Sequence, residues 1–201
     1  MMEGVGAVTR QEVVGSVPDH LESSSEHLTM VFSSATVSVT QRWKNKNLSA
    51  DFLADYFANF FPGANGSAVQ TATQAEIRGA VGFIANELLE NALKFNHDPS
   101  YNMRIHLRLY PDRLIMLSTN SVDPAAVPDL QAYVTELLSG DPGEMYIAQL
   151  ERSAAEDSQS SRMGFLSMLN DYDARLGWRF EWLNSPARET VLLTTLVTIN
   201  V

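Results

Sequence analysis

One segment of the sequence, residues 71–95, constrains the fold more than any other. Placed at about 100° per residue, its apolar residues form one narrow stripe, which predicts an amphipathic helix with a single buried face. Either Thr71 or Thr73 can cap this helix, because a threonine hydroxyl accepts a hydrogen bond from a free N–H of the first turn. The stripe contains Ile77, Val81, Ile84, Leu88, Ala92 and Phe95.

Three polar residues, Glu87, Asn91 and Lys94, follow one edge of this stripe. Their spacing of i, i+4 and i+7 places them on neighbouring turns of the helix. Two interpretations fit this pattern. The three side chains form a solvated shoulder in which Glu and Lys serve helix propensity, or they bind a ligand together.

Composition restricts the class of protein. The chain has 201 residues, of which 45% are hydrophobic and 19% charged, as in a soluble globular protein with one large domain or a domain with an appendage. No apolar run approaches the ~20 residues of a membrane span, and the N-terminus lacks the pattern of a signal peptide, so we expect a cytoplasmic protein. The absence of cysteine excludes disulfides and a cysteine nucleophile, and four scattered histidines argue against a zinc site.

The charge balance bears on the partner. The formal net charge is -10, and no cluster of Lys and Arg is visible in the sequence. A nonspecific nucleic-acid binder needs a concentrated basic surface. We therefore expect a protein or a small molecule as partner, and neither nucleic acid nor membrane.

The chain divides into an acidic N-terminal tail, residues 1–26, and one α+β domain, residues 27–201. The domain is expected to be a two-layer sandwich of helices on a mixed, mostly antiparallel sheet. Expected strands cover one or two segments of 27–42, and then 103–109, 113–118, 178–183 and 189–199. Expected helices begin at Ser49 and run to residue 60, and then cover 129–138, 143–155 and 163–175, with Gly177 ending the last one.

This order of elements, with Glu-x-x-x-Asn on the central helix, resembles the GHKL ATPase domain. That domain has the Bergerat fold, which histidine kinases, gyrase-type ATPases and bacterial anti-sigma-factor serine kinases share. Residues 87–95, with the sequence ELLENALKF, look like the N-box of this family. The resemblance implies that Asn91 holds the Mg²⁺ that bridges the phosphates of ATP, that Glu87 is the base, and that Lys94 reaches the phosphates.

Two further segments extend the comparison. Residues 161–169, SRMGFLSML, are similar to the family's glycine-rich G2 box, in which Gly164 would admit a phosphate and Arg162 would add a charge-assisted contact. Gly164 near the start of an ordinary amphipathic helix is the alternative interpretation. The G1 box, Asp-x-Gly-x-Gly, is missing: Asn120 stands where the Asp belongs, and no glycine follows it. An Asn carbonyl could still accept a hydrogen bond from the adenine amino group.

The resemblance implies an ATP- and Mg-dependent regulator, closest to stand-alone anti-sigma-factor serine kinases, which phosphorylate or sequester a STAS-domain partner. One alternative is a catalytically degenerate module of the same fold that acts by protein–protein interaction without ATP. A homodimer is a further expectation, through an edge strand near residues 30–39. A third interpretation is an unrelated α+β protein whose Glu87, Asn91 and Lys94 are simply solvated.

Overall fold

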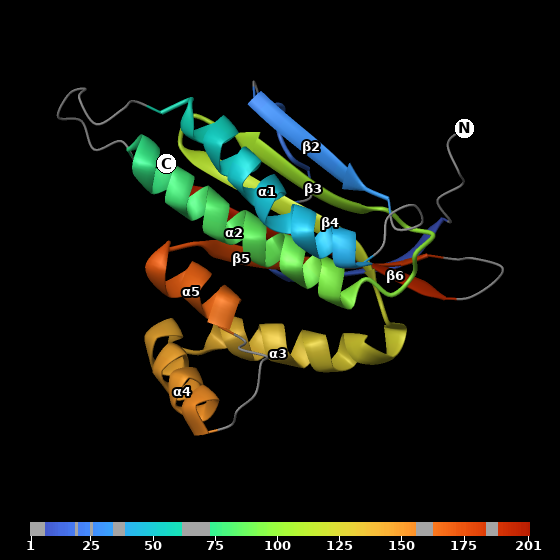
Figure 1. Cartoon of the computed structure of the whole chain (residues 1–201). Coiled ribbons are helices and arrows are strands. Elements are labelled where there is room, and N and C mark those ends of the chain that lie inside the picture. The colour runs from blue at the N-terminus through green and yellow to red at the C-terminus, as the bar shows by residue number, and fades with distance from the viewer. Residues whose placement is uncertain are drawn as a thin grey trace.

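The computed structural model describes residues 7–18, 20–24, 26–33, 39–61, 73–155, 163–183 and 189–201, without the side chains of 39–45 and 152–155. Within these residues the chain forms an α+β structure of helices packed on a single sheet (Figure 1). No helix in the described ranges combines the length and the apolar character needed to cross a membrane.

The sheet has six strands in the order β1-β5-β6-β4-β3-β2, and each neighbouring pair is antiparallel. The expected mixed character of the sheet is therefore absent from the described part of the chain, while the two-layer α+β class agrees with the structure. The strands are β1 (Val8–Gly15), β2 (Glu26–Phe32), β3 (Met103–Leu109), β4 (Arg113–Val122), β5 (Arg175–Leu183) and β6 (Thr190–Asn200).

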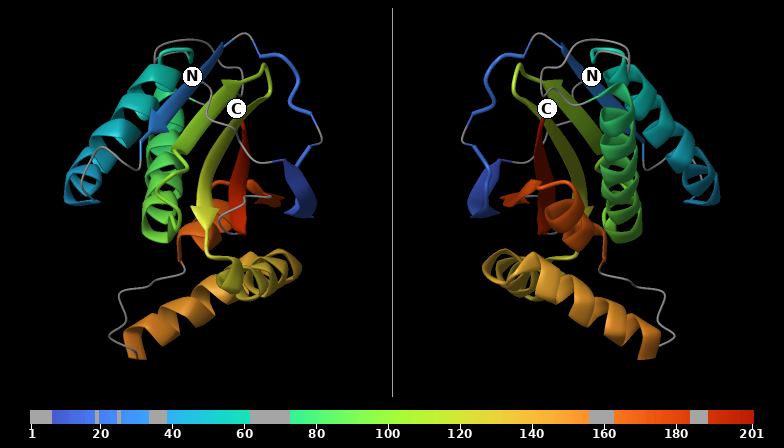
Figure 2. Two further views of the ribbon diagram at one scale, coloured as in Figure 1. Left: turned by 90° about the vertical axis from the view of Figure 1, so that its right-hand side faces the viewer. Right: turned by 90° about the vertical axis from the view of Figure 1, so that its left-hand side faces the viewer.

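Helices α1 and α2 lie side by side on one face of the sheet, as the two views of Figure 2 show. Helices α3 and α4 lie beyond one end of the sheet, and α5 lies between them and α2 (Figure 1). The helices are α1 (Val39–Ala58), α2 (Gln74–Phe95), α3 (Val127–Ser139), α4 (Pro142–Ala155) and α5 (Met163–Asp171), with a 3-10 turn, η1 (Pro124–Ala126), before α3.

Helix α2 is the central helix expected from the sequence. Thr73 is its N-cap: the Thr73 hydroxyl accepts from the Glu76 N–H, while the Glu76 carboxylate accepts from the Thr73 N–H, which is a capping box. Five of the six residues of the expected stripe are buried against the sheet and α1. Phe95 is the exception, with 55% of its surface exposed, because the helix ends there.

The N-terminal region differs from the expected tail. Residues 8–15 form β1, which pairs with β5 along its length. The following segment crosses the outer face of the sheet to reach β2 at the opposite edge (Figure 2). Leu21 packs there on Tyr110, Ile115 and Leu196, and the Tyr110 hydroxyl donates to the Glu22 carbonyl at 2.8 Å.

Three boundaries also differ from expectation. Helix α1 begins at Val39 and not at Ser49, so the β-branched segment 39–42 is helical and β2 ends at Phe32; residues 34–38 lie outside the described ranges. Helix α5 ends at Asp171, where Asp173 takes a positive φ of 48° and the Ala174 N–H donates to the Met168 carbonyl. Gly177 is not a helix cap: it lies in β5, where a Cβ would collide with the Ser16 carbonyl of the crossing segment.

Candidate functional site

The proposed base and the proposed phosphate loop meet in the structure. Glu87 lies on α2, and Gly164 lies in the first turn of α5. A Cβ added to Gly164 would overlap the Glu87 carboxylate and lie 2.9 Å from its Cδ atom. With any larger residue at position 164, the Glu87 carboxylate would have to move away from α5.

Two further charges complete what we call the Glu87 cluster, which consists of Lys46, Glu87, Glu90 and Gly164. The Lys46 ammonium, on α1, pairs with the Glu90 carboxylate at 2.6 Å. Lys46 is buried, with 9% of its side chain exposed, whereas 40% of Glu90 is exposed. One cation thus lies beside two carboxylates that are three residues apart on α2.

The surroundings of Glu87 change its acidity. Burial raises the pKa of the Glu87 carboxyl above its usual value, because the ionised form loses water. The neighbouring Glu90 carboxylate raises this pKa further, while Lys46 acts in the opposite direction. A half-buried carboxyl with a raised pKa is a suitable proton acceptor near neutral pH.

Lys46 was not among the residues that the sequence identified. It belongs to the segment expected to be a turn before a helix at Ser49, whereas α1 includes it in its first half. Only the packing of α1 against α2 brings Lys46 to Glu90. No local pattern indicates that contact, because its two partners come from different elements.

Asn91 and Lys94 lie on the next turns of α2, toward its C-terminus. Asn91 is half-buried. Lys94 is exposed, and its ammonium lies 5.4 Å from the centre of the Phe95 ring. The Asn91 side chain is therefore more buried than the Lys94 side chain.

Asn120, the residue at the expected adenine position, does not lie in a loop. Strand β4 continues through Val122, and Asn120 is a buried member of it, with 4% of its surface exposed. Its side-chain amide donates to the Ser121 carbonyl at 2.9 Å. Ser121 in turn binds Asn96, the C-cap of α2, so this end of β4 adjoins the end of α2.

The remaining residue of the expected site, Arg162, lies outside the described residues, so the structure tests no contact of this side chain. Among the residues that are described, no group of three or more His, Asp or Glu side chains could hold a metal ion. A magnesium site built from one amide, phosphates and water would not require such a group.

No protein-family model matches this chain, and a sequence search of curated proteins finds no match.

Proposed function

We propose that this chain is an ATP- and Mg-binding regulator with a Bergerat-type fold, similar to anti-sigma-factor serine kinases, that phosphorylates or sequesters a STAS-type or other signalling partner. One observation carries the proposal: the Glu87 carboxylate lies against Gly164. Two segments distant in sequence, which the resemblance assigns to opposite walls of one phosphate site, are neighbours in space. The antiparallel sheet with α2 on one face is compatible with this fold.

The chemistry assigned to the chain's own residues begins with Glu87. In a serine kinase this carboxylate would accept the proton of a serine hydroxyl as the hydroxyl oxygen attacks phosphorus. Its raised pKa suits this role, since a stronger base takes the proton more readily. Lys46 would keep the neighbouring Glu90 paired, so that the two carboxylates do not repel each other fully.

The fit of Mg-ATP is argued from the same residues. Asn91 would ligate Mg²⁺ through its amide oxygen, and Lys94, Arg162 and Gly164 would hold the phosphates. When bound, the nucleotide supplies the phosphoryl group. The backbone N–H groups in the first turn of α5 would bind the phosphates once the Glu87 side chain, which lies against Gly164, turns toward the substrate.

A second function is favoured by a different observation, the state of Asn120. Its amide group is buried in β4 and donates to the Ser121 carbonyl, and no glycine-rich turn follows this strand. Because Asn120 is buried, the amino group of an adenine base would need a different hydrogen-bond acceptor. The alternative is therefore a catalytically degenerate module of the same fold, which binds its partner without ATP. A homodimer through the β2 edge is compatible with either function.

Phosphoryl transfer distinguishes the two functions. The purified chain is incubated with Mg-ATP labelled at the γ-phosphate and with STAS-domain proteins of the source organism. The kinase proposal predicts transfer to a serine, and it predicts that Glu87→Gln lowers the rate at least about 100-fold, as expected for loss of a general base. Glu136→Gln, at an exposed position of α3, is the matched control and should leave the rate unchanged. Equal rates for both variants would refute the role of Glu87.

A further inference from the structure

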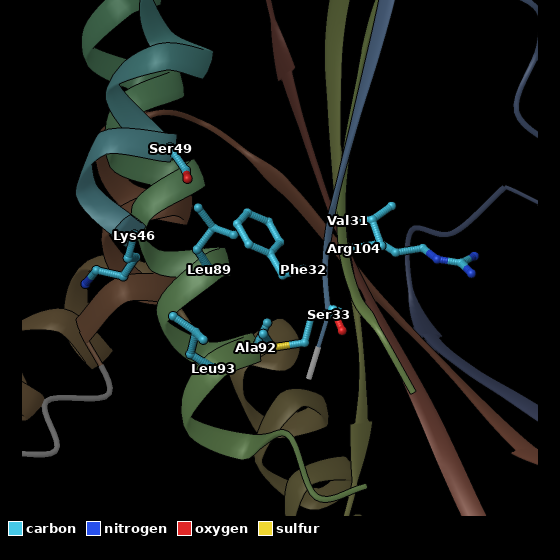
Figure 3. A pocket seen from close by; sticks show the side chains of 10 residues that line it. Val31, Phe32, Ser33, Lys46, Ser49, Leu89, Ala92, Leu93 and Arg104 are labelled. Carbon is cyan, nitrogen blue, oxygen red and sulfur yellow. The ribbon is translucent and has the colours of Figure 1, made fainter. Parts of the chain in front are cut away.

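A cavity of about 210 Å³ lies on the other side of α2, between the end of β2 and the helices α1 and α2 (Figure 3). It adjoins the Glu87 cluster through Lys46, which belongs to both, but it lies on a different side of α2 from Glu87, because Leu89 lies about 200° around the helix from Glu87. The lining residues are Val31, Phe32, Ser33, Lys46, Ser49, Leu89, Ala92, Leu93, Met103 and Arg104.

The interior of this cavity is apolar. Figure 3 shows the Phe32 ring between the strands and α2, facing Leu89, with Leu93 and Ala92 on the next turn. Ser49 contributes one hydroxyl from α1. The wall facing a ligand is therefore hydrocarbon over most of its extent.

The two charged residues of the lining do not supply a charge to the interior. The Lys46 ammonium pairs with Glu90 at 2.6 Å. The Arg104 side chain extends away from the cavity, on the opposite side of β2 and β3 (Figure 3). A charged ligand would lose water here without gaining a counter-ion, which is unfavourable.

We propose that this cavity is a binding site for a small, uncharged, apolar molecule of the size of a single aromatic ring. An apolar cavity of about 150 Å³ stays dry and binds benzene, so a cavity of this volume and lining can hold a comparable or slightly larger ligand. A nucleotide is disfavoured here, because its charged phosphates would find no counter-ion in this apolar lining. The proposal does not depend on the function of the Glu87 cluster.

Toluene and benzoate are matched probes, because they share the ring and differ in charge. Methyl NMR of the whole chain reports on the site through Ala92 and Met103, while Ala85 and Met168, buried elsewhere, serve as controls. Toluene should shift the Ala92 and Met103 methyl signals saturably and leave the control signals in place. At ten times its Kd it should raise Tm by about 3–6 °C. Benzoate should do neither.

Filling the cavity gives the second arm. Ala92→Leu should abolish the toluene shifts at Met103, whereas Ala75→Leu, at an exposed position of the same helix, should preserve them. If Ala92→Leu does not fold by circular dichroism, the titration of the unmodified chain decides alone. The proposal is overturned if toluene causes no saturable shift at Ala92 and Met103, if benzoate binds as well as toluene, or if folded Ala92→Leu still binds toluene.

Discussion

The Glu87 carboxylate and the backbone of Gly164 are in direct contact, although they belong to helices far apart in the sequence. This contact is one of the places where α5 packs against α2. It also holds the carboxylate half-buried, beside the Lys46–Glu90 ion pair. The stability and the chemistry of the candidate site therefore depend on the same few atoms.

Gly164→Ala tests this contact. The added Cβ overlaps the Glu87 carboxylate, which is the end of a flexible side chain and must turn away, so Gly164→Ala should lower the free energy of unfolding by about 0.5–1.5 kcal/mol. In a Glu87→Ala background the same change should be neutral or stabilising, which gives a coupling energy of about 0.5–3 kcal/mol in denaturant unfolding. Gly79→Ala is the control: no atom lies within 4 Å of a Cβ built there, so alanine should stabilise α2 by about 0.5–1 kcal/mol. If the effects of Gly164→Ala and Glu87→Ala on the free energy of unfolding simply add, the contact between the two residues is contradicted.

Glu87→Gln tests the raised pKa of Glu87. Because this pKa is higher in the folded state, the group favours folding at pH values below the usual glutamate pKa, and this contribution is lost as the pH rises through the folded pKa. Glutamine stays neutral at all pH values. The Tm of Glu87→Gln should therefore exceed that of the unmodified chain at neutral pH, and the difference should shrink as the pH falls below about 4. A difference that is independent of pH would show that burial does not oppose ionisation here.

Lys46→Met tests the buried cation. Methionine keeps the apolar part of the side chain but removes the partner of Glu90. Since Lys46 is buried and Glu90 is partly exposed, the loss should lower the free energy of unfolding by about 1–3 kcal/mol. Lys94→Met, at an exposed position, should change it by less than about 0.5 kcal/mol. Equal effects of the two substitutions would mean that the ion pair contributes nothing measurable.

The strand nature of residues 8–15 is testable with two neighbouring valines. Val14 packs against the core beneath the helices, whereas Val13 points to the outer face and is 45% exposed. Val14→Thr should lower the free energy of unfolding by about 1–2 kcal/mol, because a hydroxyl is placed against apolar neighbours. Val13→Thr should stay within about 0.5 kcal/mol. Two equally small effects in denaturant unfolding would favour the loosely held tail that the sequence suggested.

The parts of the fold that the sequence predicted are those whose pattern is local. The sequence offers Thr71 or Thr73 as the cap of α2, of which the structure uses Thr73, and the apolar period of the helix gives its buried face. The β3–β4 hairpin follows from alternation on both sides of a Pro-Asp turn. The helices in the second half of the chain were also located to within a few residues.

The parts that were missed depend on tertiary partners. In β1, Arg10 and Glu12 share a face with Val14, so the strand shows no apolar alternation. The strand is stabilised by its pairing with β5 and by the Arg10 guanidinium, which lies over the Trp182 ring. The polar end of β4 was expected to be a loop, but hydrogen bonds of Ser121 with Asn96 and Asp98 satisfy it inside the protein. Lys46 was missed for the same reason: it lies in the candidate site only because α1 packs against α2.

The central claim is that a nucleotide binds where α2 and α5 meet. Calorimetric titration with Mg-ATP tests it most directly, on the unmodified chain, on Asn91→Ala, and on Asn47→Ala as a control at an exposed position of α1. The account predicts micromolar binding that Asn91→Ala weakens at least about tenfold and Asn47→Ala leaves unchanged, a loss of about 1.4 kcal/mol or more. Absence of binding to the unmodified chain, or equal affinity of Asn91→Ala, would contradict it.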